Sequence, residues 1–561
     1  MDYMNRYQHW MDTAPLTEEE RNALCAMTAE DDRKGAFGAE LQFGTAGIRG
    51  IMGMGTNRLN DYTVRRTAQG LAAWLVTTDL PKRCAIGYDS RHNSRRYAEI
   101  CACALAEEGV EVHLYHELAP TPMLSYAVRQ FHCGCGIVVS ASHNAGAYNG
   151  IKCYGPDGCQ MTDEPAAIVF EKISAIPYFV APKESFEAHL EAGRIRYIPM
   201  EMWESYYETV LRERVTAEPA NNLNLLYTPL CGTGNKPVRE VLDRIGVNVD
   251  IVKVQEQPDG DFKTCEYPNP ETDAALNESY KIARNTHPDL ILGTDPDCDR
   301  VAVAIPDGEG FRKLSGNELG CLLLDYILSE AVIPNAPVAV RSIVSTPMAD
   351  RIAEKYGVKM QAVLTGFKYI GGEILKLEEA NEEYRFVFGF EESCGYLKGT
   401  YARDKDAVVA SMLTCDLAAK LKREGMNLAQ KMDALYEELG YHEAKVISIE
   451  LTGPNAMELS AKFMADFRAN VPTELCGIAV TECTDYQTRL CKNLLTGEET
   501  PVALPKSNVV TLVLGDKGSV IVRPSGTEPK LKFYLTAVDH SKQAAQSLLG
   551  DLAKAMEQFL P

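Results

Sequence analysis

Helical and strand-like patterns of apolar residues alternate along most of the chain. Around Leu71 the segment YTVRRTAQGLAAWL has the period of a helix, and CAIGYDS is typical of a strand. The segment ICACALAEEGVEVHLY predicts a second helix that ends at Gly109, with a strand after it. Alternation of this kind predicts an α/β fold with a largely parallel sheet.

The same order of elements recurs twice more along the chain. A helix, a glycine-valine pair and a strand follow one another at Gly246-Val247 and again at Gly357-Val358. Each of the three copies later reaches an apolar strand that ends in a polar loop, where GIVVS runs into ASHN, LILGT into DPDCDR and FVFGF into EESCGY. We infer three related α/β units. Ligands in such sheets bind beyond the carboxyl ends of strands, so these three loops are predicted to hold the chemistry.

After about Gly440 the pattern changes to shorter alternating runs, AKVISIEL, VVTLVLGD and SVIVRPSG, followed by the helical segment SKQAAQSLLGDLAKAMEQF. This change predicts a smaller α+β domain at the carboxyl-terminal end. Further breaks occur near residues 197–203, 305–315 and 437–442. We therefore predict four domains, at residues 1–203, 204–312, 313–438 and 439–561.

Composition and charge mainly exclude classes of partner. The 561-residue chain has a formal net charge of -21 and no basic block, which argues against a nucleic-acid or anionic-membrane partner. The amino-terminal segment lacks the apolar core of a signal peptide, and no run approaches the ~18 apolar residues of a membrane span. The 17 cysteines, an odd number without any C-x-x-C pair, are typical of reduced thiols. We expect a soluble, cytoplasmic protein; the sequence does not indicate its oligomeric state.

The loop GTDPDCDR carries three alternating aspartates, Asp295, Asp297 and Asp299. In an extended loop alternate side chains face one side, so we expect the three carboxylates to converge on a cation such as Mg²⁺. An EF-hand is excluded, because Arg300 stands where that motif needs glycine and Pro306 where it needs glutamate. A solvated acidic turn is the alternative for this segment alone. Arg300 could offset the repulsion among the three aspartates or hold a phosphate, and the sequence does not choose between these two roles.

The segment RPSGTEPKLKFY has the composition of an anion-binding turn. Arg523 offers a planar fork for phosphate, while Ser525, Gly526 and Thr527 offer hydroxyl groups and clustered backbone N–H groups. Lys530 adds a positive charge. A plain turn before the strand LKFYLTAV explains this segment equally well.

Three further loops carry donor and acceptor groups close together in the sequence. GFEESCGY and YARDKDA contain Glu391, Ser393, Arg403 and Lys405, whose acceptors suit sugar hydroxyls and whose cations suit phosphate, and TGFK at residues 365–368 is similar in kind. FGTAGIRG contains Arg49, but neither G-x-G-x-x-G nor G-x-x-x-x-G-K-[ST] occurs, so no nucleotide site is predicted. Each of these loops could also be plain surface.

Ser142 follows the apolar strand GIVV within the loop SASHN. It does not stand in G-x-S-x-G, so the nucleophile turn of the α/β-hydrolases is not matched. His143 is the next residue, and neighbours on an extended chain point apart. We therefore expect no serine–histidine pair of the protease type, and a polar cap on the strand would also explain the serine.

Taken together, SASHNAGAYNGIK, DPDCDR, GFEES and RPSGTEPK resemble in order and spacing the motifs of the α-D-phosphohexomutase superfamily, which includes the phosphoglucomutases and phosphomannomutases. The likeness extends over nearly the whole chain. It implies a heart-shaped architecture of three related α/β domains and a smaller α+β carboxyl-terminal domain. It also implies an intramolecular phosphotransferase of the isomerase class that acts on a small sugar phosphate.

The resemblance also implies roles for individual residues. Ser142 would carry a phosphoryl group, and His143 and Lys152 would assist proton transfer. The ligands of Mg²⁺ would be Asp295, Asp297, Asp299 and an oxygen on phosphorylated Ser142. The substrate-binding residues would be Arg49, Arg300, Thr365, Gly366, Lys368, Glu391, Ser393, Arg403, Lys405, Arg523, Ser525, Gly526, Thr527 and Lys530.

The reaction that the resemblance implies converts glucose 1-phosphate to glucose 6-phosphate and back, through glucose 1,6-bisphosphate. Relatives that act on mannose or pentose phosphates share these motifs, so those substrates stay open. A metal-dependent sugar phosphatase and a non-catalytic sugar-phosphate binder are alternatives of other classes. Two residues depart from the family pattern: Ala145 replaces a frequent proline, and Cys298 would make the activity sensitive to oxidation if its thiol were exposed.

Overall fold

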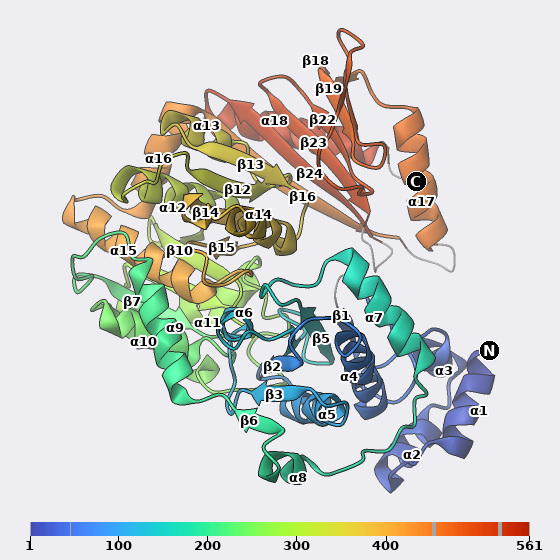
Figure 1. The fold of residues 1–561 in the computed structure, drawn as a ribbon. Helices are drawn as coiled ribbons and strands as arrows, with labels where there is room; N and C mark the ends of the chain where they lie inside the picture. Colours follow the sequence, from blue (N-terminus) through green and yellow to red (C-terminus); the bar gives the residue numbers. More distant parts are fainter. Residues whose placement is uncertain (1, 45–46, 452–455, 525–529, 560–561) are drawn as a thin grey trace.

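The computed structural model describes residues 2–44, 47–451, 456–524 and 530–559, with the side chains of residues 456–457 left out (Figure 1). Within these residues the strands form four large sheets and one short two-stranded ribbon, in chain order. None of the helices in these ranges combines the length and the hydropathy that a membrane span requires.

The first sheet is built from six strands in the order β1-β5-β4-β2-β3-β6. Its strands are β1 (Gly47–Ile51), β2 (Arg83–Tyr88), β3 (Glu111–Leu114), β4 (Cys135–Val139), β5 (Tyr148–Tyr154) and β6 (Ile195–Tyr197). The helices of this part are α1 (Tyr3–Thr13), α2 (Glu18–Ala26), α3 (Glu30–Phe37), α4 (Asp61–Leu75), α5 (Ser94–Ala106), α6 (Thr121–Gln130), α7 (Asp163–Ala175) and α8 (Phe186–Glu191).

The second and third sheets have the orders β11-β10-β9-β7-β8 and β13-β12-β14-β15. The second contains β7 (Asn224–Thr228), β8 (Asn248–Ile251), β9 (Leu290–Thr294), β10 (Val301–Asp307) and β11 (Gly310–Lys313), with α9 (Met200–Arg212), α10 (Asn235–Arg244) and α11 (Asn277–Thr286). The third contains β12 (Val338–Ser342), β13 (Lys359–Val363), β14 (Phe386–Glu391) and β15 (Gly395–Leu397), with α12 (Gly316–Glu330), α13 (Met348–Lys355), α14 (Phe367–Glu379), α15 (Ala407–Arg423) and α16 (Leu428–Leu439).

These three sheets share one arrangement of four strands. In the first, β2 is parallel to β3 and β4, and β4 is antiparallel to β5. In the second, β7 stands in the same relation to β8 and β9, and β9 is antiparallel to β10. In the third, β12 pairs in parallel with β13 and β14, and β14 in antiparallel with β15. The predicted threefold repeat is confirmed, and each sheet is mixed, with parallel pairs at its centre and an antiparallel strand beside them.

The three loops predicted to hold the chemistry occupy equivalent places in the repeat. Each follows the third strand of its unit, namely β4, β9 or β14, and leads into the antiparallel fourth strand. Every residue of these three strands is buried. Burial explains why their sequences are continuous apolar runs without alternation, and the chain turns polar only where each strand leaves the core.

The carboxyl-terminal part forms the fourth sheet, with the order β16-β24-β23-β22-β19-β20-β21 and only antiparallel pairs. Its helices α17 (Ala456–Ala469) and α18 (Lys542–Glu557) complete the predicted α+β domain. The strands are β16 (Tyr441–Glu450), β19 (Glu482–Asp485), β20 (Leu490–Asn493), β21 (Glu499–Pro501), β22 (Val510–Val513), β23 (Gly518–Pro524) and β24 (Lys530–Asp539), and the short ribbon is β17 (Glu474–Leu475) with β18 (Ile478–Ala479). The boundaries that we predict between the four domains stay a prediction.

Candidate active site

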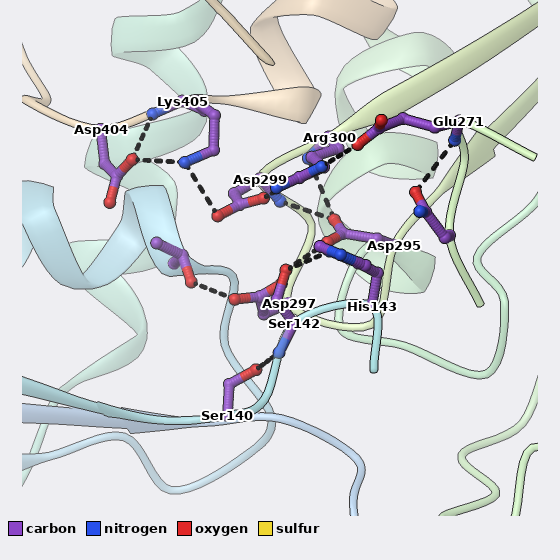
Figure 2. Close-up of polar contacts among 12 residues, drawn as sticks. Ser140, Ser142, His143, Glu271, Asp295, Asp297, Asp299, Arg300, Asp404 and Lys405 are labelled. Carbon is purple, nitrogen blue, oxygen red and sulfur yellow. Dashed lines mark hydrogen bonds and ion pairs between the residues drawn. The ribbon is translucent and has the colours of Figure 1, made fainter. Parts of the chain in front are cut away.

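The loop after β4 meets the loop after β9 at a buried contact between the first and second sheets (Figure 2). The hydroxyl of Ser142 donates to Asp295 Oδ2 at 3.0 Å. Ser142 is 2% exposed and Asp295 is not exposed at all. A serine from one α/β unit therefore contacts a carboxylate from the next, away from solvent.

The backbone at Ser142 brings its side chain beside that of His143. Ser142 has φ 53°, in the left-handed region, and its N–H donates to Ser140 Oγ at 2.7 Å. Because the chain is turned rather than extended there, Ser142 Oγ lies 3.2 Å from His143 Nδ1. The expectation that these neighbours point apart is wrong. Left-handed backbone at a non-glycine residue costs energy and is typical of functional sites.

The ring of His143 is held neutral by its surroundings. Burial is the largest cause, and the positive charges of Arg300 and Arg49 add to it, so the pKa of His143 lies well below its usual value. A neutral imidazole has one ring nitrogen free to accept a proton. The pair can thus exchange a proton between Ser142 Oγ and the ring.

The three aspartates converge, although their loop is not extended. Residues 296–299 form a turn in which Cys298 N–H donates to Asp295 O at 2.9 Å and Cys298 has φ 54°. One carboxylate oxygen from each of Asp295, Asp297 and Asp299 lies within 4.8 Å of the others, and all three residues are buried. The predicted convergence is correct, whereas the predicted extended backbone is wrong. The turn replaces simple alternation as the reason that the side chains meet.

Cys298 lies inside this turn with no exposed surface. Burial is also the main reason that the pKa of its thiol lies well above the usual value. A buried, protonated thiol reacts slowly with oxidants. We expected oxidation to affect the activity only if the thiol of Cys298 were exposed, and it is buried.

Two lysines from distant segments balance the carboxylates. Lys152 Nζ, on β5, lies 2.6 Å from Asp297 Oδ2 and 3.3 Å from Asp299 Oδ2. Lys405 Nζ lies 3.2 Å from Asp299 Oδ2 (Figure 2). Burial is the largest single influence and alone would raise the pKa of Asp297, but the charge and hydrogen bond of Lys152, together with hydrogen bonds involving Asp295 and Thr121, make the net shift downward. Asp297 and Asp299 are thus ionised although they are buried, whereas burial and the two neighbouring carboxylates raise the pKa of Asp295 well above its usual value.

The donor set fits a divalent cation. Asp297 Oδ1 and Asp299 Oδ1 are buried and have no hydrogen-bond partner in the described part of the chain. Buried carboxylate oxygens without a partner are costly, and a bound cation would offset that cost. Three oxygen ligands of this hard type suit Mg²⁺ better than a softer metal.

Arg300 and Arg49 lie at the margin of the cluster. Arg300 forms an ion pair with Glu271, on the segment that precedes α11, and its Nε is 3.7 Å from Asp299 Oδ1. Arg49, on the edge strand β1, donates to Asn144 Oδ1 at 3.3 Å. Arg49 thus contacts the loop that carries Ser142, and Arg300 contacts the aspartate loop to which it belongs.

The residues predicted on the third sheet gather beside β14. Gly366 N–H donates to Glu391 Oε1 at 2.7 Å, and Gly366 has φ 121°, which glycine adopts without strain. Thr365 Oγ1 is buried without a partner among the described groups. Lys368 Nζ pairs with Asp163 Oδ1 at 2.6 Å, and Ser393 lies in the loop after Glu391. Within this group the hydroxyl of Thr365 is therefore available to bind a ligand.

Arg403 is 1% exposed and takes part in a network that joins two domains. Its Nη2 donates to Glu378 Oε2 at 2.7 Å, and Glu378 Oε1 accepts from Arg129, on α6, at 2.8 Å. In this arrangement the arginine predicted to bind substrate also connects the first and third sheets.

This network predicts a pH dependence of stability. Arg129, with a contribution from Arg403, lowers the pKa of Glu378 from 4.5 to about 2. A lowered folded-state pKa gives stability that is present above the unfolded value and lost as the pH falls through the folded one. We expect Glu378→Gln to be less stable than the wild type near neutral pH, with a difference that shrinks between about pH 4.5 and 2.

Chemical denaturation of both proteins across this range measures the difference in free energy of unfolding. The exposed neighbour Glu379, changed to Gln, is the control and should match the wild type throughout. A difference between wild type and Glu378→Gln that stays constant with pH would contradict the assignment.

The fourth sheet contributes Arg523, at the end of β23, and Lys530, at the start of β24. Lys530 Nζ pairs with Glu450 Oε1 at 2.9 Å. Ser525, Gly526 and Thr527 lie outside the described residues, so the predicted anion-binding turn is not described.

Sequence reasoning missed several residues that contact the site. Thr121 Oγ1 donates to Asp297 Oδ2 at 3.0 Å, and Arg91 donates to Ser142 O at 2.5 Å. Asp89, 3.2 Å from Arg91, and Glu271 are two more. The sequence could have indicated Asp89 and Arg91. They follow the apolar strand CAIGY of β2 directly, and polar residues at the carboxyl end of a strand are the same signal that marked the other loops.

Three repeated α/β sheets with a fourth domain, and a buried serine beside three aspartates, agree with what the resemblance to the phosphohexomutases implies. Family models for phosphoglucomutase/phosphomannomutase match in chain order, with alpha/beta/alpha domain I at residues 40–178, domain II at 204–308, domain III at 315–439 and the C-terminal domain at 492–555. The chain belongs to the phosphoglucomutase/phosphomannomutase family. The resemblance drawn from the sequence motifs and the predicted fold class are confirmed, and the chain is a mutase of the isomerase class.

Curated relatives cover nearly the whole chain. A phosphoglucomutase of Staphylococcus epidermidis is 36% identical over 528 residues, which are 93% of this chain and 95% of that protein. A phosphoglucomutase of Staphylococcus aureus is 34% identical over 510 residues, 90% of this chain and 91% of that protein.

Solved structures share the fold at lower identity. A putative phosphomannomutase from Thermus thermophilus has a TM-score of 0.68 at 21% identity and covers 92% of this chain and 99% of its own. The open form of pp63/parafusin from Paramecium has a TM-score of 0.67 at 16% identity and covers 93% and 96%. At this low sequence identity, the two structures support the assignment of the fold and say nothing about the substrate.

Proposed function

We propose that this protein interconverts glucose 1-phosphate and glucose 6-phosphate, with Ser142 carrying the phosphoryl group between the two positions of the sugar. The observation that carries the proposal is the 3.0 Å contact from Ser142 Oγ to Asp295 Oδ2, within a group of three buried aspartates. A serine that merely capped a strand would need no such partner. The relatives named phosphoglucomutase, 34% and 36% identical, favour glucose phosphates as the substrates.

The proposed reaction moves one phosphoryl group at a time. Phosphorylated Ser142 gives its group to the free hydroxyl of a hexose monophosphate, so that the bond from phosphorus to Oγ breaks as the bond to the sugar oxygen forms. The resulting glucose 1,6-bisphosphate turns round, and its other phosphoryl group returns to Oγ. Such transfer depends mainly on positioning and on neutralised charge.

Two groups are placed to hold the proton at Ser142 Oγ. Asp295 Oδ2 lies 3.0 Å from it and His143 Nδ1 lies 3.2 Å from it, and the lowered pKa of His143 keeps that ring neutral, with one nitrogen able to accept a hydrogen bond. We propose that Lys152 assists the proton transfer at the reacting oxygens as a hydrogen-bond donor. Its ion pairs with Asp297 and Asp299 hold its ammonium group within the aspartate cluster and keep it protonated.

We propose Mg²⁺ as the cation, held by Asp295, Asp297 and Asp299 with an oxygen of phosphorylated Ser142. When bound, it would offset the charge that develops on the phosphoryl oxygens. The two carboxylate oxygens without hydrogen-bond partners, on Asp297 and Asp299, support this choice.

The remaining residues are proposed to hold the sugar phosphate. Glu391 and Ser393 would bind sugar hydroxyls, and Arg523 with residues 525–527 would bind the phosphate that does not react. The other proposed contacts are Arg49, Arg300, Thr365, Gly366, Lys368, Arg403, Lys405 and Lys530. Glucose 1,6-bisphosphate would act both as intermediate and as the compound that primes Ser142.

A product assay separates the proposed mutase from a phosphatase. Incubation with Mg²⁺, glucose 1-phosphate and a trace of glucose 1,6-bisphosphate is expected to yield glucose 6-phosphate without inorganic phosphate, because the acceptor is sugar rather than water. A dehydrogenase-coupled assay and a phosphate assay measure the two products in parallel. Inorganic phosphate in amounts equal to the substrate consumed would identify a metal-dependent sugar phosphatase instead.

A substrate panel tests the choice of sugar. We expect kcat/KM to be higher for glucose 1-phosphate than for mannose, glucosamine or ribose 1-phosphate, measured side by side. A higher value on mannose or ribose 1-phosphate would reassign the substrate to that of a phosphomannomutase or a phosphopentomutase.

A further inference from the structure

One buried arginine binds the inside of the loop that carries Ser142. Arg91 Nη1 donates to Ala145 O at 2.8 Å and to Tyr148 O at 3.0 Å, and Nη2 donates to Ser142 O at 2.5 Å and also to Asn144 O. The side chain has no exposed surface. A single guanidinium group therefore donates hydrogen bonds to four backbone carbonyl groups of one short loop.

The arginine is itself fixed from two sides. Its Nε lies 3.2 Å from Asp89 Oδ2, and the other oxygen of Asp89 accepts from Ser94 Oγ at 2.6 Å and from Arg91 N–H at 3.0 Å. Its guanidinium lies 4.9 Å from the centre of the Phe262 ring. Phe262 belongs to the segment between β8 and α11, so the second domain covers an arginine of the first.

The same segment of the second domain touches the serine loop directly. A Cβ on Gly146 would stand 2.7 Å from Gly260 O, so these two backbones are in close contact. His92 Nε2 lies 2.6 Å from Asp261 Oδ1 across the same junction. Residues 259–262 thus contact both the serine loop and the arginine that holds it.

We propose that Arg91 is a positioning residue that sets the left-handed backbone at Ser142, and that residues 259–262 of the second domain hold it in place. Only the expected effect on kcat rests on the proposed function; the role of Arg91 in holding the loop does not. The second domain therefore contacts the serine loop at two places. Phe262 covers Arg91, which holds the loop, and Asp295 accepts a hydrogen bond from Ser142 itself. Lysine could not replace the arginine, because its ammonium has three donors on one atom and cannot reach four carbonyls as a planar fork does.

The test compares Arg91→Lys with Arg65→Lys. Arg65 is the matched control because it is also buried, pairs with Glu107 and donates to Val180 O at 3.0 Å, but contacts the far end of α5 rather than the serine loop. We expect kcat of Arg91→Lys to fall about 100-fold, since a small misplacement of a reacting group costs that much. KM should stay within about threefold, because ground-state binding is untouched.

Amide hydrogen exchange gives a readout that does not depend on activity. Arg91→Lys is expected to speed exchange of the amides at residues 142–148 while β2 and β4 exchange as in the wild type. Phe262→Leu should produce the same change to a smaller extent. Arg65→Lys should leave both kcat and the exchange of residues 142–148 unchanged.

The outcomes separate the two proposals. A wild type that transfers no phosphoryl group to sugar would overturn the proposed function, and the exchange data would still decide the role of Arg91. A kcat of Arg91→Lys within about threefold of wild type would overturn the positioning role, as would exchange that rises uniformly over the first domain.

Discussion

Ser142→Ala is expected to lower kcat for the conversion of glucose 1-phosphate by at least about 10⁴-fold, as removal of a nucleophile does in other enzymes. The reason is that no other hydroxyl group among the described residues stands where Ser142 Oγ does, 3.0 Å from Asp295 Oδ2 and 3.2 Å from His143 Nδ1. The measurement is the steady-state rate in the coupled assay with saturating glucose 1,6-bisphosphate.

Ser411→Ala is the matched control for this substitution. Ser411 is a buried serine on α15, and its hydroxyl has no partner within the ranges that the structure describes. Its loss should leave the rate unchanged. A Ser142→Ala protein that keeps more than about a tenth of the wild-type rate, with the same unfolding midpoint, would rule out Ser142 as the phosphoryl carrier.

Asp297→Asn is expected to weaken binding of Mg²⁺ at least about 10- to 100-fold, the loss seen when even supporting residues of a metal site are changed. Asp297 Oδ1 is buried without a hydrogen-bond partner among the described residues, and an amide in its place brings no negative charge. The reaction rate should fall with the bound metal. Isothermal titration with Mg²⁺ measures the affinity, and removal of the metal with a chelator should stop the wild-type reaction until Mg²⁺ is returned.

Asp325→Asn serves as the control for Asp297→Asn. Asp325 is also buried and ionically paired, with Lys431 Nζ 2.7 Å from its Oδ2, but it lies on α12, outside the aspartate cluster. We expect that variant to lose stability and to keep the wild-type affinity for Mg²⁺. Equal affinities for Asp297→Asn and the wild type would remove the aspartate cluster as the metal site.

The repeat of three α/β units could be predicted because its signal is local. The strands β4, β9 and β14 are covered on both faces, so each is a short apolar run, and each ends where the chain turns polar. Identical strand order follows once three such units are recognised. The loops that contain Ser142, Asp295 and Glu391 could be identified because each directly follows one of these apolar strands.

The details within those loops could not be predicted, because they depend on backbone angles and on distant partners. Nothing in the letters Ser-His shows that Ser142 has φ 53°, yet that angle brings Oγ to the ring of His143. The pairing of Lys405 with Asp299 joins segments far apart in the sequence. The end of β2 could have indicated where Arg91 lies, but not its role, because Arg91 binds backbone carbonyl groups, which every residue has.

The central claim, that Ser142 carries the phosphoryl group from one sugar to the next, is tested most directly by following labelled phosphate. The enzyme is incubated with glucose 1,6-bisphosphate that carries radiolabelled phosphoryl groups, separated from it, and chased with unlabelled glucose 1-phosphate. We predict that the label is first found on the peptide containing Ser142 and then passes to sugar phosphate. Label on another residue, or its release as inorganic phosphate during the chase, would contradict the account.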